Sequence, residues 1–168
     1  MTASGCAPTV QDYGRLLRDD PAYAERAARL SELAIDISEF IERQDLSALR
    51  PDLATDRPIA FHAPCSLQHG LKRGGRVETL LTGLGFRLTP VADAHLCCGS
   101  AGSYAVLQQD LSERLLANKI RNLEAGDPAL IATANIGCLM HMENHAGVPV
   151  KHWIELLETL IPNIERKS

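Results

Sequence analysis

The chain has 168 residues, of which 45% are hydrophobic and 23% charged, and its formal net charge is −4. These values are typical of one soluble globular domain with a full hydrophobic core. The negative charge, without any cluster of lysines or arginines, argues against a nucleic-acid-binding surface. No apolar run approaches the roughly 18–20 residues of a membrane span, and residues 1–10 lack the pattern of a secretory signal. We therefore expect a cytoplasmic, reducing environment, where clustered cysteines indicate metal or redox chemistry more often than disulfides.

Residues 1–58 are expected to form an N-terminal segment with a linking helix. Residues 1–20 are polar, and we predict an irregular conformation for them. Between residues 21 and 43 apolar side chains recur at the spacing of one helical face, which predicts a single amphipathic packing helix. Residues 44–58 are predicted to be a connector with a short helical turn.

From residue 59 onward the pattern alternates between strands and helices. Strands are predicted at 59–62, 86–92, 130–134 and 148–151. Helices are predicted at 77–84, 102–124 and 153–161, and a short helix follows the strand at 130–134 and ends near residue 142. Such alternation predicts an α/β domain at 59–168, with a parallel sheet, right-handed crossovers and flanking helices in a Rossmann-like three-layer arrangement. Sheets of this kind bind ligands beyond the carboxyl ends of their strands.

Four of the five cysteines follow predicted strands, namely Cys65, Cys97, Cys98 and Cys138. Because the carboxyl ends of parallel strands meet at one edge of the sheet, we expect these four thiols to converge. Four thiolates can hold either an iron–sulfur cluster or a tetrahedral zinc ion. Neighbouring side chains on extended backbone point apart, so the adjacent pair Cys97-Cys98 favours a cluster, in which the two sulfurs bind different metal atoms.

The residues after the cysteine pair favour an anionic ligand. Gly99 and Gly102 allow close approach of the backbone, and the first amides of the helix predicted at 102–124 point outward as donors. A thiolate-ligated cluster is anionic and suits such a place. A phosphate loop is the alternative, but the chain has neither a G-x-G-x-x-G fingerprint nor a Walker lysine.

Several histidines lie near the cysteines. Cys138 and His141 are predicted to share a helical face, which makes His141 a candidate fifth ligand or a hydrogen-bond donor to a cluster sulfide. We interpret His62, His69 and His95 as loop histidines in preference to ligands.

Nucleophilic catalysis explains less of the pattern. A thiol hydrolase with Cys65 or Cys138 as its nucleophile leaves the Cys97-Cys98 pair unexplained. The chain also has no C-x-x-C motif to support thiol–disulfide exchange.

Taken together, these motifs resemble the C-terminal cysteine-rich (CCG) domain of the glycolate oxidase iron–sulfur subunit family. That pattern is one cysteine, then Cys-Cys-Gly, then Cys-x-x-Cys, with long gaps between. The matching stretches are HAPCSLQHG (62–70), HLCCGSAGSYA (95–105), IATANIGCLMH (131–141) and KHWIELLE (151–158). The similarity covers nearly the whole chain.

The resemblance implies an iron–sulfur electron-transfer domain with no substrate chemistry of its own. It would pass electrons from a flavin-containing 2-hydroxy-acid dehydrogenase subunit, as in glycolate dehydrogenase, towards quinone. The ligands implied are Cys65, Cys97, Cys98 and Cys138. The resemblance also implies an absent N-terminal ferredoxin-like domain and an absent first cysteine-rich half, whose closing cysteine would be Cys6. The implied location is cytoplasmic, or peripheral at the inner face of the membrane.

The chain departs from the family pattern at its last position, where Cys138-Leu139-Met140-His141 replaces Cys-x-x-Cys. The resemblance therefore leaves open a [4Fe–4S] cluster of the non-cubane type, a zinc ion or an empty site. The alternative function is a zinc-binding or metal-free structural module that docks on a partner subunit.

Overall fold

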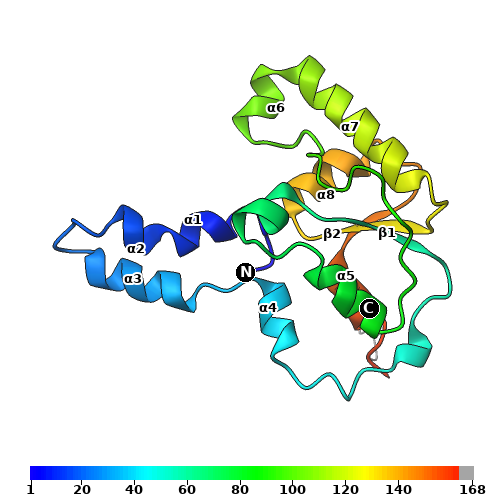
Figure 1. Cartoon of the computed structure of the whole chain (residues 1–168), viewed down its shortest axis with the longest axis horizontal. Coiled ribbons are helices and arrows are strands. Elements are labelled where there is room, and N and C mark those ends of the chain that lie inside the picture. The colour runs from blue at the N-terminus through cyan, green and yellow to red at the C-terminus, as the bar shows by residue number, and fades with distance from the viewer. Residues whose placement is uncertain (163–168) are drawn as a thin grey trace, which may run out of the picture.

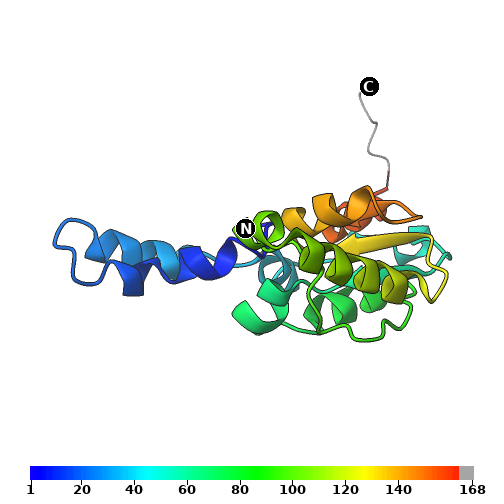
Figure 2. The same cartoon turned by 90° about the horizontal axis from the view of Figure 1, so that it is seen from above.

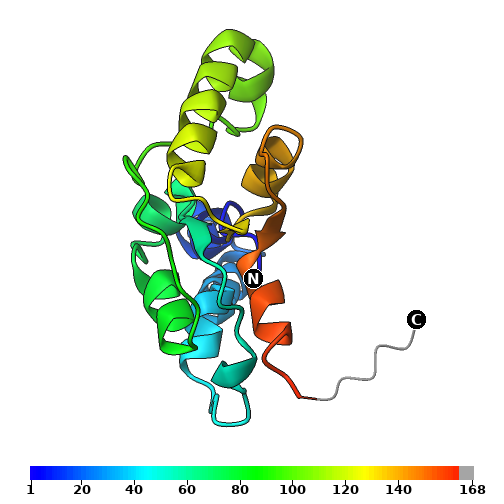
Figure 3. The same cartoon turned by 90° about the vertical axis from the view of Figure 1, so that its right-hand side faces the viewer.

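A parallel sheet forms the centre of the computed structural model, which describes residues 1–162. Strands β1 (Ile59–His62), β2 (Leu130–Thr133) and β3 (Val150–His152) pair in this order, all parallel. Figures 1 and 3 show helices α7 (Gln109–Glu124) and α8 (Ile136–Glu143) on one side of the sheet. Helices α5 (Arg76–Gly83) and α9 (Trp153–Glu158) lie on the other side. The predicted three-layer α/β fold is confirmed.

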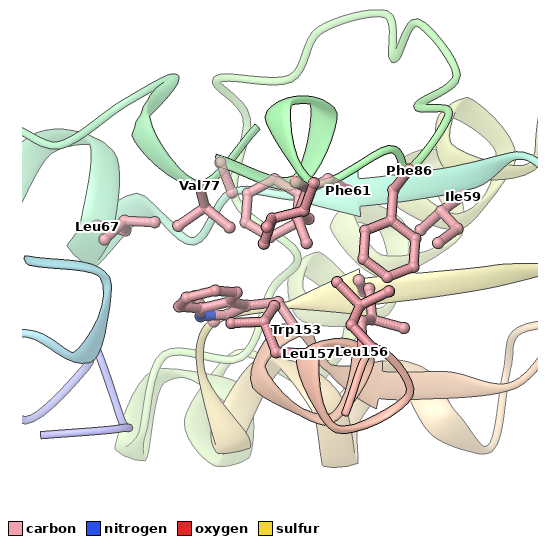
Figure 4. Packing of buried hydrophobic residues seen from close by; sticks show 14 residues of the cluster. Ile59, Phe61, Leu67, Val77, Phe86, Trp153, Leu156 and Leu157 are labelled. Carbon is pink, nitrogen blue, oxygen red and sulfur yellow. The ribbon is translucent and has the colours of Figure 1, made fainter. Parts of the chain in front are cut away.

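The alternation of side chains along β1 divides the core into two clusters. Ile59 and Phe61 belong to the cluster that α5 and α9 complete, and Figure 4 shows Trp153 lying against it opposite Val77. Ala60 points the other way and packs with α7 and α8. His62, two residues after Ala60, therefore faces α7 and α8 as well.

The N-terminal residues form an arm of short helices that extends away from the sheet (Figures 1 and 2). Its helices are α1 (Ala7–Gln11), α2 (Tyr13–Leu16) and α3 (Ala24–Leu33), so the prediction of an irregular 1–20 segment is wrong. Gly14 permits the close packing of α2 on α3, because a Cβ at this position would lie 2.9 Å from the Ala28 Cα. The Gly14 amide donates to Ser31 Oγ at 2.8 Å.

The prediction of a single helix at 21–43 is also wrong, because a non-helical segment separates α3 from α4 (Ile37–Glu42). Asp36 caps α4 by accepting hydrogen bonds from the Ser38 amide at 2.9 Å and the Ser38 hydroxyl at 2.6 Å. The terminal amino group of Met1 donates to the Ile35 carbonyl at 2.7 Å. Met1, which is distant in sequence, therefore satisfies a backbone carbonyl between the two helices. The apolar spacing of residues 21–43 contains no sign of this long-range contact, so it predicts one continuous helix.

Two further predictions need correction. The helix predicted at 102–124 is two helices, α6 (Ser103–Leu107) and α7, and α6 turns Val106 and Leu107 to the surface. The strand predicted at 86–92 is reduced to one parallel bridge between Leu88 and Ile59.

The connector at 44–58 contains the short 3-10 helix Pro51–Leu53, as predicted. A five-residue π-helix, Ser66–Gly70, follows Cys65 and was not predicted. Among the described residues, none of the helices is both long and apolar enough to cross a membrane.

Candidate metal centre

The four cysteines at predicted strand ends lie together in a row. Cys65 follows β1, Cys97 and Cys98 follow the segment that bridges to β1, and Cys138 lies in the first turn of α8 after β2. Side-chain interactions link Cys65 to Cys97, Cys97 to Cys98, and Cys98 to Cys138. Cys65 is exposed, Cys97 is partly exposed, and Cys98 and Cys138 are buried. The row therefore leads from the surface into the core beneath α7 and α8.

The interactions between the thiols shift their pKa values in opposite directions. The interaction with Cys138 raises the pKa of Cys98 to about 12, and the same contact lowers the pKa of Cys138. The interaction with Cys98 raises the pKa of Cys97, and burial raises that of Cys65. Three of the four thiols thus hold their protons firmly, and a metal ion must displace these protons when it binds.

His62 lies at the buried end of the row. One nitrogen of its ring and the sulfurs of Cys98 and Cys138 all lie within 4.8 Å of one another. The residue is 2% exposed, and neither ring nitrogen has a hydrogen-bond partner among residues 1–162. Burial lowers the pKa of His62 to about 3, with a smaller contribution from Lys119, so the ring is neutral. Neutral imidazole and thiols are metal donors.

The structure places the expected loop histidine His62 inside β1. The sequence could have predicted this buried position, because side chains alternate along a strand. His62 therefore lies on the same face as Ala60, at the carboxyl end of a buried strand. His69 and His95 are not part of the donor group that His62 forms with Cys98 and Cys138.

A buried lysine faces the thiols from α7. Lys119 is 1% exposed, and its Nζ donates to the carbonyl oxygens of Asp93 at 3.0 Å and Ala94 at 3.3 Å. No carboxylate forms an ion pair with it in the part of the chain that the structure describes. Burial lowers the pKa of Lys119, and the nearby thiols of Cys98 and Cys97 act in the opposite direction. An anionic site would supply the missing counter-charge.

Gly99 fits the cysteine loop tightly between α7 and α8. Its φ is +91°, and a Cβ there would lie 2.4 Å from the carbonyl oxygen of Ser112. Its amide donates to Cys97 Sγ at 3.3 Å, and its carbonyl accepts from Ser112 Oγ at 3.1 Å. His141 Nε2 lies 3.3 Å from the same hydroxyl, outside the group of His62, Cys98 and Cys138. The role of His141 as a fifth ligand stays a prediction.

We expect Gly99→Ala to destabilise the protein far more than Gly102→Ala. Both glycines have positive φ, but a Cβ at Gly102 would have no neighbour within 4 Å. Gly102→Ala should therefore cost only the strain of its positive-φ backbone, of about 1–3 kcal/mol. Gly99→Ala adds the collision with Ser112, for a total of roughly 3–5 kcal/mol. Urea unfolding of the two variants measures the difference, and equal midpoints would contradict the tight fit.

The first residues of the chain reach the edge of this site. The Ser4 amide donates to the Ala134 carbonyl at 3.2 Å, and the Gly5 amide donates to Asn135 Oδ1 at 3.1 Å. Asn135 Nδ2 in turn donates to Cys138 Sγ at 3.5 Å. Cys6 itself is exposed and lies outside the donor group, so its assignment to an absent first half stays a prediction.

Comparison with known proteins identifies a family and several relatives that this chain resembles. Residues 59–143 match the family described as "Cysteine-rich domain" (CCG). The glycolate oxidase iron-sulfur subunit of Escherichia coli (strain K12) is 48% identical over 158 residues, which cover 94% of this chain and 38% of that protein. The probable glycolate oxidase iron-sulfur subunit of Bacillus subtilis (strain 168) is 31% identical, over 84% of this chain and 32% of that protein.

The chain thus spans less than half of these two relatives. Lactate utilization protein A of Geobacillus thermodenitrificans (strain NG80-2) is covered to 68% of its length, at 30% identity over 94% of this chain. The matched residues 59–143 contain Cys65, Cys97, Cys98 and Cys138, so the family match and the thiol row coincide. The chain belongs to the CCG cysteine-rich domain family.

Proposed function

We propose that this chain is an iron–sulfur electron-transfer domain of a glycolate oxidase-like complex. The observation that carries the proposal is the row of four thiols that runs from exposed Cys65 to buried Cys138, beside the buried Lys119, which has no carboxylate partner among residues 1–162. Two curated relatives are named as iron-sulfur subunits, which supports the same chemistry.

The residues fit the chemistry of such a group. Cys65, Cys97, Cys98 and Cys138 would hold it, with His141 as a further candidate, and a bound iron–sulfur cluster supplies one-electron transfer. Cys98 and Cys138 would anchor it in the core. The Gly99 amide, which donates to the Cys97 sulfur, would stabilise a thiolate there. The non-cubane [4Fe–4S] type remains part of this proposal.

Within the complex, the partner would be a flavin-containing 2-hydroxy-acid dehydrogenase subunit. The hydroxy acid would be oxidised on that subunit, and electrons would pass through this domain towards quinone at the inner face of the membrane. A ferredoxin-like domain and a first cysteine-rich half would complete the iron–sulfur subunit.

Anaerobic reconstitution with iron and sulfide tests the proposal. We expect the purified 168-residue chain to bind iron and sulfide in near-equal amounts and to develop a broad visible charge-transfer absorption that dithionite bleaches. Metal and sulfide analysis and the visible spectrum measure this. Stoichiometric zinc without sulfide, and no visible absorption after reconstitution, would overturn the cluster proposal.

Zinc is the second candidate, in a structural or docking module. The group formed by His62, Cys98 and Cys138 favours it, because mixed imidazole and thiolate donors are common around tetrahedral zinc. Cys97 is the neighbouring thiol that would complete four ligands.

Metal binding is expected to strengthen steeply with pH. Thiols with raised pKa values, as at Cys97 and Cys98, keep protons that compete with the metal at neutral pH. Each thiol that loses its proton should raise the apparent affinity about tenfold per pH unit. His62, with a pKa of about 3, is already neutral and adds nothing to the slope. Zn²⁺ competition titrations between about pH 6.5 and 8.5 measure the slope; a flat profile would contradict the thiol assignment.

A further inference from the structure

His62 is a buried polar side chain that has no hydrogen-bond partner in the described part of the chain. It is 2% exposed, and both ring nitrogens lack hydrogen-bond partners among residues 1–162. An unsatisfied buried polar group costs roughly 1–3 kcal/mol, so such groups in native proteins need an explanation. An apolar side chain at this position would avoid that cost.

The neighbour of His62 on the next strand is a second buried polar side chain. Its register partner on the neighbouring strand is Thr133, whose side chain lies on the same face of the sheet. The Thr133 hydroxyl is fully buried and also has no partner in the described chain. Two polar groups without partners among the described residues thus lie side by side at the carboxyl edge of the sheet, and one of them, His62, lies within 4.8 Å of the sulfurs of Cys98 and Cys138.

The ring is prepared to donate a lone pair to a metal. It is neutral, so no proton has to leave before a nitrogen binds a metal. One nitrogen lies within 4.8 Å of both the Cys98 and Cys138 sulfurs, a spacing that one metal atom can bridge from the centre. His141 is less well placed, because its Nε2 contacts the Ser112 hydroxyl outside this group.

We propose that His62 is a direct nitrogen ligand of the metal that Cys98 and Cys138 hold. The proposal rests on the proposed function, in that it assumes a metal at the thiol row, but it applies to iron or zinc. The centre would then have one neutral donor in place of a thiolate. For an iron–sulfur centre, a histidine ligand raises the reduction potential relative to cysteine ligation alone.

The test compares His62→Phe and His62→Gln with the matched control His145→Gln. Phenylalanine fills the space of the ring without a donor atom, and His145 is exposed at the end of α8 and outside the donor group. The first probe is Co²⁺ alone, titrated anaerobically into the full 168-residue chain and followed by its thiolate charge-transfer and d–d absorption. We expect His62→Phe and His62→Gln to lose at least tenfold in Co²⁺ affinity and to change the d–d bands. His145→Gln should match the unmodified chain.

A second measurement does not depend on any variant folding. The unmodified chain labelled with ¹⁵N-histidine should show a strongly coupled histidine nitrogen in pulsed EPR of the reduced, iron-reconstituted centre. Unchanged Co²⁺ affinity and bands in both His62 variants, or no coupled nitrogen in the labelled chain, would overturn the proposal. If the unmodified chain binds Co²⁺ but forms no cluster, the electron-transfer proposal fails while the ligand assignment is still decided by the cobalt data.

Discussion

Replacing Cys98 by serine is expected to abolish the bound centre. Cys98 is the middle member of the row, in contact with both Cys97 and Cys138, and it is 1% exposed. A serine hydroxyl is a hard donor that a soft metal site binds poorly. Loss of residues that only support ligands typically costs about 10–100-fold in metal affinity, and loss of a ligand should cost at least as much. Iron content and visible absorption after anaerobic reconstitution measure the effect.

Cys6→Ser is the matched control for this experiment. It removes one thiol from the same chain, but Cys6 is exposed and outside the donor group. We expect Cys6→Ser to keep the iron, the sulfide and the visible absorption of the unmodified chain. Full retention of iron in Cys98→Ser, or loss of iron only in Cys6→Ser, would reject the thiol row as the metal site.

The sequence was sufficient to predict the sheet and the convergence of the cysteines. The apolar runs at 59–62 and 130–134 are short and buried, so their period and length identify them as inner strands. Once these strands are parallel, Cys65 and Cys138 must meet at their carboxyl edge. This inference needs no knowledge of side-chain packing, which explains its success.

The helix breaks depended on contacts that no local pattern contains. The break before α4 places Ile37 and Ile35 within reach of Met1, and the Ile37 amide donates to the Met1 carbonyl at 2.8 Å. The apolar spacing in 21–43 continues across this break, so periodicity alone predicts one helix. Elements joined by such long-range hydrogen bonds require the tertiary structure.

The two polar residues at the core of the site were missed for a related reason. His62 and Lys119 each lie among apolar residues of their own element, where the residue type alone does not indicate a role in a site. Lys119 lies three residues after Leu116 and four before Leu123, so it lies on the buried face of α7. A charged residue on an apolar helical face is the signal that could have identified it, because lysine is almost never fully buried without a partner.

Lys119→Met is expected to weaken the bound centre while leaving the fold intact. The variant loses two hydrogen bonds to loop carbonyls, but it also removes a buried charge that has no carboxylate partner in the described chain. These changes oppose each other, and we expect a net change in the unfolding free energy of only about 1 kcal/mol. Urea unfolding of the metal-free chain checks this.

Lys119→Met should have a larger effect on the metal-bound site than on the unfolding free energy of the metal-free chain. Two unit charges about 6 Å apart in a medium of effective dielectric about 20 interact by about 3 kcal/mol. Removing the ammonium should therefore lower metal affinity by roughly ten- to a hundredfold and shift the reduction potential to more negative values, because reduction adds negative charge. Metal competition titrations and redox titration of the visible absorption measure both quantities.

Lys119→Arg tests whether a positive charge at this position is sufficient to keep the reduction potential. Arginine keeps the positive charge and can still donate to the Asp93 and Ala94 carbonyls, so its potential should stay near that of the unmodified chain. If methionine and arginine shift the potential equally, the positive charge at position 119 does not set the potential. A shift to more negative potential that is confined to methionine is the result expected if the positive charge at position 119 balances an anionic thiolate centre.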